Sequence, residues 1–149
     1  MLNRKDVAPD FKVGSGSLYD TLARRAAVVF FYPKAFTRGC TKEAKRFRLD
    51  YEKLKESGCE VIGVSRDDEE TNARFRKALD LPYPLVSDPE GAICRAYKVS
   101  WPLIGRAKRV TYLIGKDRLV RLAFHDELNM DAHIDQACAF APTGPTAPA

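Results

Sequence analysis

The sequence lacks any long hydrophobic run. No stretch approaches the roughly 18 apolar residues that a membrane span requires, and the N-terminal MLNRKDVAPDF lacks the apolar segment of a secretory signal. We therefore expect no membrane association and a cytoplasmic location, where a reducing environment keeps thiols free.

Closely spaced cysteines are also missing. The four cysteines stand far apart, at positions 40, 59, 94 and 138. This spacing contains none of the near pairs that hold zinc or define a dense disulfide framework. Neither a zinc site nor a disulfide-stapled fold is therefore indicated.

The chain has an excess of positive charge, but its charged residues of both signs are spread along most of the sequence. A net charge of +5 and a pI near 9.1 would admit a nucleic-acid partner. However, Lys and Arg alternate with Asp and Glu along most of the chain, and the denser clusters ARR at 23–25 and KRFR at 45–48 fall on expected helices or helix ends. Net charge reports on solubility and steering rather than on fold, so we expect no nucleic-acid partner.

The periodicity of apolar residues indicates an alternation of strands and helices. Short runs rich in β-branched and aromatic residues predict strands at 26–32, 60–64, 84–88, 110–114 and 119–124. Helical spacing predicts helices at 40–57, 68–80, 91–97 and 130–141. Residues 115–118, GKDR, form the turn of a closing hairpin.

This order of elements predicts the α/β class, with a mixed β-sheet flanked by helices on both faces. The 149 residues fit one domain. We place that domain at residues 1–140. The remaining segment, 141–149, is rich in Pro and Thr and is expected to be a flexible C-terminal tail.

The stretch PKAFTRGCTKEA, residues 33–44, places Cys40 alone after a buried strand and a short loop, at the start of a helix. The free N–H groups of a first helical turn stabilise an anion, and the nearby cations Lys34, Arg38 and Lys42 add to that effect. These surroundings favour a reactive thiolate. The alternative is that Cys40 is only a small core residue on the apolar face of the helix.

Three chemistries could use such a thiol. Thiol–disulfide exchange needs a second cysteine three residues away, where this chain has Thr37 and Glu43. Phosphate-ester hydrolysis would use the Cys-x5-Arg spacing of Cys40 and Arg46, but the intervening TKEAK contains no glycine and places Glu43 where a phosphate would bind. Attack on a peroxide, which converts the cysteine to a sulfenic acid, remains the best fit.

Peroxide cleavage needs a thiolate, a fixed line of approach and groups that hold the departing oxygen. The Thr37 hydroxyl could hydrogen-bond to the peroxide, and Pro33 would stiffen the loop and shield the thiolate from water. Arg109 precedes the strand at 110–114, and adjacent parallel strands could bring it to the Cys40 loop. A guanidinium is suited to this place because its planar fork can orient two oxygens.

At this point the chain resembles the peroxiredoxins. PKAFTRGCTKE matches the Pro-x-x-x-Thr-x-x-Cys signature of that family, and the wider pattern is similar to its Q-type, or bacterioferritin-comigratory-protein, subfamily. The resemblance covers residues 5 to 138 in five blocks that occur in the expected order: APDF at 8–11, FFYPKAFTRGCTKEA at 30–44, GVSRD at 63–67, PLVSDPEG at 84–91 and RVTYLI at 109–114.

The resemblance implies a thioredoxin-like fold, no cofactor and no metal. It also implies a thiol-dependent peroxidase that reduces hydrogen peroxide and small organic hydroperoxides. Cys40 would be the peroxidatic cysteine, Thr37 and Arg109 would activate it and the peroxide, Pro33 would shield the pocket, and Glu43 would order Arg109 or the first helical turn. The alternative function is a thioredoxin-fold exchange or interaction protein without peroxidase activity.

The chain departs from the family pattern in its second cysteine. Many Q-type members carry a resolving cysteine five residues after the peroxidatic one, where this chain has Lys45. Cys94 is the first candidate to resolve, followed by Cys138 and Cys59, and each would require local unfolding around Cys40. The other possibility is a one-cysteine cycle, in which thioredoxin, glutaredoxin or a low-molecular-weight thiol is the reductant. By analogy with relatives, we expect a monomer or a weak homodimer.

Three aromatic residues elsewhere invite a role at the site. Neither His125 nor His133 lies near the cysteine motif in sequence, and we expect both at the surface or at helix ends. Trp101 precedes Arg109 by eight positions and is a candidate wall of the pocket.

Overall fold

The computed structural model describes residues 1–103 and 105–141. Within them, the main sheet has the order β5-β4-β3-β6-β7, with β3 at its centre. Strand β3 pairs in parallel with β4, and β4 with β5, whereas β6 is antiparallel to both β3 and β7. The strands span Ala26–Phe31 (β3), Cys59–Ser65 (β4), Leu85–Ser87 (β5), Val110–Ile114 (β6) and Val120–His125 (β7).

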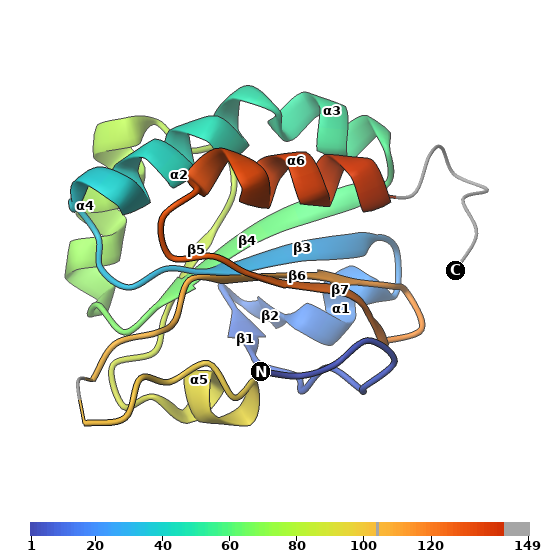
Figure 1. Cartoon of the computed structure of the whole chain (residues 1–149). Coiled ribbons are helices and arrows are strands. Elements are labelled where there is room, and N and C mark those ends of the chain that lie inside the picture. Colours follow the sequence, from blue (N-terminus) through green and yellow to red (C-terminus); the bar gives the residue numbers. More distant parts are fainter. Residues whose placement is uncertain (104, 142–149) are drawn as a thin grey trace.

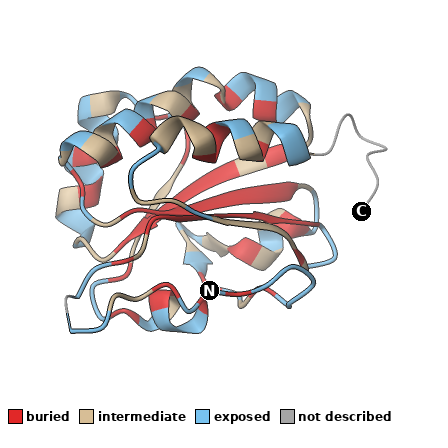
Figure 2. Cartoon of the chain, in the orientation of Figure 1, coloured by how far each residue is buried: buried red, intermediate tan, exposed pale blue. Residues whose placement is uncertain are grey.

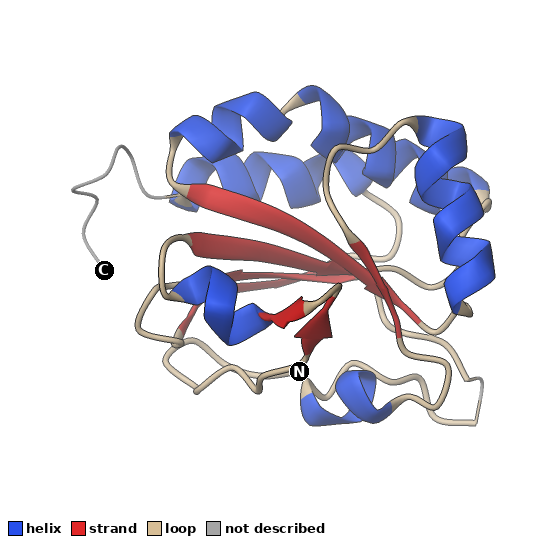
Figure 3. Ribbon diagram, turned by 180° about the vertical axis from the view of Figure 1, so that it is seen from behind, coloured by secondary structure: helices blue, strands red, loops and turns tan. Residues whose placement is uncertain are grey.

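Helices cover both faces of this mixed sheet, as predicted (Figure 1). One face carries Arg38–Leu49 (α2), Tyr51–Glu56 (α3), Glu69–Leu79 (α4) and Met130–Phe140 (α6). The other carries Leu18–Leu22 (α1), Ala92–Ala96 (α5) and a small hairpin of Lys12–Val13 (β1) and Gly16–Ser17 (β2), as Figure 3 shows from behind. The fold is thioredoxin-like.

The central strand shows why the sheet needs two covering layers. All six residues of β3 are buried (Figure 2), and successive side chains of a strand point to opposite faces of its sheet. Val28 and Phe30 join the core beneath α2, while Val29 and Phe31 join the core beneath α1 and α5. The continuous apolar run AAVVFF is thus explained by burial on both sides.

Several predicted elements differ in detail. The single helix expected at 40–57 is two helices, α2 and α3, because Asp50 (φ −97°, ψ 6°) interrupts the helical backbone. Gly58, at φ 89°, adopts the left-handed conformation that ends α3. Helix α1 and the β1–β2 hairpin were not predicted. The expected tail at 141–149 lies, beyond Ala141, outside the described residues.

The register of the sheet positions the candidate site. Phe31 at the end of β3 pairs with Val110 at the start of β6. Arg109 therefore stands beside the loop that leaves β3 and leads to Cys40. The expectation that parallel strands would bring Arg109 to the Cys40 loop was wrong, because β3 and β6 are antiparallel. In this antiparallel pair, the end of β3 lies beside the start of β6. In the described part of the chain, no helix is both long and apolar enough to cross a membrane.

Candidate active site

Cys40 lies in the first turn of α2 and is almost fully buried, with 1% of its surface exposed. Thr37 is the N-cap residue of the helix, with extended backbone angles. Its hydroxyl donates to the Lys34 carbonyl oxygen at 2.6 Å. Because that proton is engaged, Thr37 presents oxygen lone pairs and is set to accept a hydrogen bond from a ligand rather than to donate one.

Arg109 is the cation that reaches the sulfur. Its Nη1 lies 3.5 Å from Cys40 Sγ and 3.0 Å from Glu43 Oε1, and donates to both. Its Nε and backbone N–H donate to the carbonyl oxygen and the carboxylate of Glu127, at 3.2 and 2.8 Å. The guanidinium is thus fixed from two sides, and only 6% of the residue is exposed.

The cations next to Cys40 in sequence have other surroundings. Lys34 and Arg38 are exposed, and Lys42 pairs with Asp131 on α6 at 3.5 Å. The positive charge at the sulfur is therefore contributed by a residue 69 positions further along the chain, together with the first turn of α2.

Glu43 and Arg109 form a buried ion pair. Glu43 is fully buried. Burial raises the pKa of the Glu43 carboxyl to about 8, and the attraction of Arg109 only partly opposes this effect. Burial alone would lower the pKa of Arg109, but Glu43 and Cys40 outweigh it and raise that pKa.

His133 is part of this cluster, and the prediction of a surface or helix-end position for it was wrong. Helix α6 packs on the sheet and buries the ring completely. The ring Nδ1 lies 2.7 Å from Thr111 Oγ1 on β6 and 3.7 Å from Glu43 Oε2. Sequence reasoning missed His133 and Thr111. The residues that follow them, Ile134 and Tyr112, belong to the apolar patterns that predicted a buried helix and a buried strand.

The loop before Cys40 is held by polar contacts to Asp67, which follows β4, and to Asn72 on α4. The Ala35 N–H donates to Asp67 Oδ2 at 2.8 Å, and Ser65 Oγ donates to the same oxygen at 2.8 Å. Tyr32 donates to Asn72 Oδ1 at 2.5 Å. These contacts fix both ends of the segment that contains Pro33, which is half-buried. They were not predicted, because nothing in the local sequence links residues about 30 to 40 positions apart.

The other cysteines do not meet Cys40 in the described fold. Cys94 belongs to the core on the opposite face of the sheet. Cys59 pairs with Ala26, at the opposite end of β3 from Phe31 and the loop to Cys40, and that strand is about 16 Å long at 3.3 Å per residue. Cys138 lies 3.9 Å from the carboxylate of Asp50, ten residues and about 15 Å along α2. Burial raises the pKa of each of these three thiols.

Trp101 and His125 lie at the edge of the site. The Trp101 ring stands 6.4 Å from that of His125, whose Nε2 is 2.7 Å from Glu127 Oε2. That carboxylate also accepts from the backbone of Arg109. His125 is exposed, as predicted. Trp101 is thus linked to Arg109 indirectly, through His125 and Glu127.

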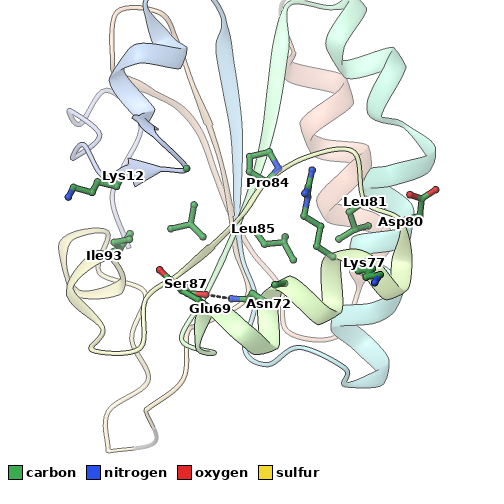
Figure 4. A pocket seen from close by; sticks show the side chains of 14 residues that line it. Lys12, Glu69, Asn72, Lys77, Asp80, Leu81, Pro84, Leu85, Ser87 and Ile93 are labelled. Carbon is green, nitrogen blue, oxygen red and sulfur yellow. Dashed lines mark hydrogen bonds between the residues drawn. The ribbon is translucent and has the colours of Figure 1, made fainter.

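A separate pocket opens between α4 and β5 (Figure 4). Asn72 Nδ2 donates to Ser87 Oγ across its wall at 2.8 Å. Lys12 and Lys77 contribute cations, and Glu69 and Asp80 contribute carboxylates. Among the described residues that line it, none is a predicted site residue, so the pocket and the Cys40 site are distinct.

The mixed sheet, a lone cysteine at a helix start and a buried arginine on its sulfur define a thioredoxin-like thiol protein. The sequence model of the AhpC/TSA family matches residues 5–123. The structure aligns with that of peroxidoxin BcpB from Mycobacterium tuberculosis with a TM-score of 0.88 and 34% identity, over 95% of this chain and 97% of that one. The chain therefore belongs to the AhpC/TSA family and, within it, to the Q-type peroxiredoxins.

Two further proteins show the extent of this similarity. The chloroplastic peroxiredoxin Q of Gentiana triflora is 41% identical over 117 residues, which cover 78% of this chain and 54% of that protein. The bacterioferritin comigratory protein of Xanthomonas campestris aligns with a TM-score of 0.72 and 30% identity, over 79% of this chain and 78% of that one. The chain spans about half the length of the first curated relatives it matches.

Proposed function

We propose that the protein is a thiol-dependent peroxidase that reduces hydrogen peroxide and small organic hydroperoxides at Cys40. The observation that carries this proposal is the contact of Arg109 Nη1 with Cys40 Sγ, at 3.5 Å, in a buried site at a helix start. The guanidinium and the first-turn amides stabilise a thiolate and the oxygen that departs from it. Family membership supports the same activity.

In the proposed step, the thiolate attacks one oxygen of the hydroperoxide and the O–O bond breaks. The sulfur gives up two electrons and becomes a sulfenic acid, and the second oxygen leaves as hydroxide or alkoxide and takes up a proton. Thr37 accepts a hydrogen bond from the peroxide O–H and so fixes the line of attack. Arg109 holds the departing oxygen, Pro33 keeps bulk water from the sulfur, and Glu43 holds Arg109.

Organic hydroperoxides are included among the substrates because of a relative. The Xanthomonas campestris bacterioferritin comigratory protein is described as having alkyl peroxide reduction activity. Phe36, on the loop before Cys40, is 54% exposed, and we propose that it contacts the alkyl group of such a substrate.

We propose a one-cysteine cycle. A disulfide needs Cα atoms within about 7 Å, whereas Cys94 lies across the sheet, Cys59 lies at the opposite end of β3 from the Cys40 loop, and Cys138 lies beside Asp50, about 15 Å along α2 from Cys40. An external thiol would attack the sulfenic acid, release water and form a mixed disulfide. A second thiol would then regenerate Cys40. Thioredoxin, glutaredoxin and low-molecular-weight thiols are the proposed reductants, and the working unit is a monomer or weak homodimer.

We propose a reducing compartment, the cytoplasm, because all four cysteines are free thiols. The similar plant protein of Gentiana triflora is chloroplastic. Fractionation of the source cells, with detection of the native chain, tests this point, and recovery in an oxidising compartment would contradict it.

Consumption of hydrogen peroxide with dithiothreitol as reductant tests the activity. Cys40→Ser should abolish turnover, whereas the matched control Cys94→Ser should retain it, because Cys94 lies in the opposite core. Turnover that survives Cys40→Ser would refute the assignment. Insulin reduction tests the exchange-protein alternative, and we expect none, since positions 37 and 43 hold Thr37 and Glu43 rather than a second cysteine.

A further inference from the structure

Two acidic groups share one guanidinium nitrogen at the base of this site. Nη1 of Arg109 donates to Cys40 Sγ and to Glu43 Oε1, at 3.5 and 3.0 Å. Cys40 and Glu43 are 1% and 0% exposed. Burying two anions beside a single cation leaves one negative charge without compensation, which is costly in a low-dielectric interior. When Cys40 is ionised, charge balance therefore requires a proton on Glu43.

The second carboxyl oxygen of Glu43 shows where that proton would reside. Among the described residues, Glu43 Oε2 is buried and has no hydrogen-bond partner, while Oε1 is occupied by Arg109. A bare carboxylate oxygen without a donor is unfavourable in such a place. A protonated Oε2 fits this arrangement better, because a neutral carboxyl costs far less to bury without a partner than a charged one.

The side chain nearest that oxygen, His133, has no proton to donate to it. Its Nε2 is 2.7 Å from the Asp126 carbonyl oxygen, which can only accept, so Nε2 carries the ring proton. Burial lowers the pKa of His133, and the neutral ring therefore uses the lone pair of Nδ1 to accept a hydrogen bond from the Thr111 hydroxyl at 2.7 Å, while Glu43 Oε2 lies 3.7 Å from the same unprotonated nitrogen. An unprotonated Nδ1 offers no donor to a carboxylate at Oε2, and so does not favour ionisation of Glu43.

Burial and the charge of Glu127 favour the protonated form of Glu43 and so raise its pKa, whereas Arg109 opposes them and lowers it. The ionisable groups that face Glu43 from the elements packed around it are Cys40, Arg109, His133, Glu127, Tyr32 and Tyr83.

We propose that Glu43 is the internal proton donor of the reaction: it holds a proton on Oε2 while Cys40 is ionised and releases it when Cys40 becomes a sulfenic acid. This inference rests on the proposed peroxidase function. The step is Cys40 thiolate plus hydroperoxide plus Glu43 carboxylic acid, giving Cys40 sulfenic acid, alcohol or water, and Glu43 carboxylate. The sulfur loses two electrons, the O–O bond gains them, and the departing oxygen takes the proton of Glu43.

Glu43 also takes part in the step that reduces the sulfenic acid back to the thiolate. Once the thiolate charge is gone, the Glu43 carboxylate and Arg109 form a compensated ion pair. Reduction by an external thiol regenerates the Cys40 thiolate and releases one proton, which Glu43 takes back. His133 is a positioning residue in this scheme, because it acts on the site through Glu43.

Proton uptake during a single turnover tests the donor. The reduced full-length chain is mixed with one equivalent of hydrogen peroxide in a weakly buffered solution with a pH indicator. The ultraviolet absorbance of the thiolate is followed in the same mixture, and intact mass verifies the gain of one oxygen. The other three thiols add little thiolate signal, because burial raises their pKa values.

We expect almost no proton uptake by the wild-type chain near pH 6.5 and one proton per thiolate consumed in Glu43→Gln, which has no proton to give. Glu70→Gln, an exposed substitution of the same kind on α4, should behave as wild type. One proton taken up by the wild-type chain near pH 6.5, with the thiolate signal lost, would overturn the proposal and leave the peroxidase function standing. A chain that gains no oxygen refutes the peroxidase function itself.

The wild-type chain alone provides a second test that does not depend on the folding of Glu43→Gln. Uptake should rise from near zero to one proton as the pH passes through the pKa of Glu43 in the reduced protein, because Glu43 is then already ionised. In His133→Gln, a side-chain N–H can donate to Oε2 and favour the carboxylate, so this rise should move to lower pH. An uptake of one proton by the wild-type chain at every pH would contradict the role of Glu43 as proton donor. An unchanged midpoint in His133→Gln would contradict the role of His133 as its positioning residue.

Discussion

Gly39→Ala tests whether the position of Arg109 limits the reaction. Gly39 lies in the first turn of α2, next to Cys40. A Cβ built there would overlap the terminal methyl group of Met130 and stand 3.2 Å from Arg109 Nη2. Met130 is flexible and can swing away, but Arg109 is held by Glu43 and Glu127 and must shift as a unit.

The expected size of the effect follows from that crowding. An ordinary contact distance is about 3.5–4.0 Å, so the guanidinium must move by a few tenths of an ångström. A misplacement of about 1 Å can cost about 100-fold in rate, and we expect a loss of about 5- to 10-fold in the rate constant for Cys40 oxidation. Stability should change little, because replacing a helical glycine by alanine contributes about 0.5–1 kcal/mol that offsets the crowding.

Single-turnover kinetics with hydrogen peroxide, together with urea unfolding, measure both quantities. The control is Gly39→Ala combined with Met130→Ala, which removes the overlap with the methyl group and leaves the crowding of Arg109. This double variant should recover any lost stability and remain slow. A wild-type rate in Gly39→Ala would refute the placement of Arg109 in the reaction.

Three further predictions concern the same cluster. Arg109→Lys should slow Cys40 oxidation by about 10- to 150-fold in single-turnover kinetics, because the loss of one charge-assisted hydrogen bond costs about 1.5–3 kcal/mol; an unchanged rate would show that a point charge suffices. In urea unfolding, wild-type stability should fall relative to Glu43→Gln as pH rises from about 4.5 to 8, by up to ~1.4 kcal/mol per pH unit, since the pKa of Glu43 is raised on folding. Conversely, stability should fall as pH drops below about 6.5 because the pKa of His133 is lowered on folding, and His133→Gln should remove that slope.

The sequence predicted the sheet strands and the main helices well, because their apolar spacing reflects burial that the fold imposes. The run AAVVFF indicated a strand buried on both faces, and that is its position in β3. The break at Asp50 was not predicted, because the apolar face continues through Tyr51 and Leu54. Only the backbone angles of Asp50 depart from helical values.

At the candidate site, the sequence indicated Cys40, its helix start and Arg109, but it also expected the neighbouring cations of the motif to act on the sulfur. Lys34 and Arg38 are near in sequence yet exposed, whereas Arg109 reaches the sulfur because β3 and β6 are antiparallel neighbours. His133 was missed for the same reason. Its contact with Glu43 depends on the packing of α6 against α2, which no spacing within either helix encodes.

The most direct test of the central claim is the intact mass of the reduced protein after one equivalent of hydrogen peroxide, followed by peptide mapping. We predict a gain of one oxygen or its trapped sulfenic-acid adduct, located on Cys40, with Cys59, Cys94 and Cys138 unmodified. Oxygen located on another cysteine, or no reaction of Cys40, would contradict the account. A loss of two hydrogens would instead identify a disulfide and contradict the one-cysteine cycle.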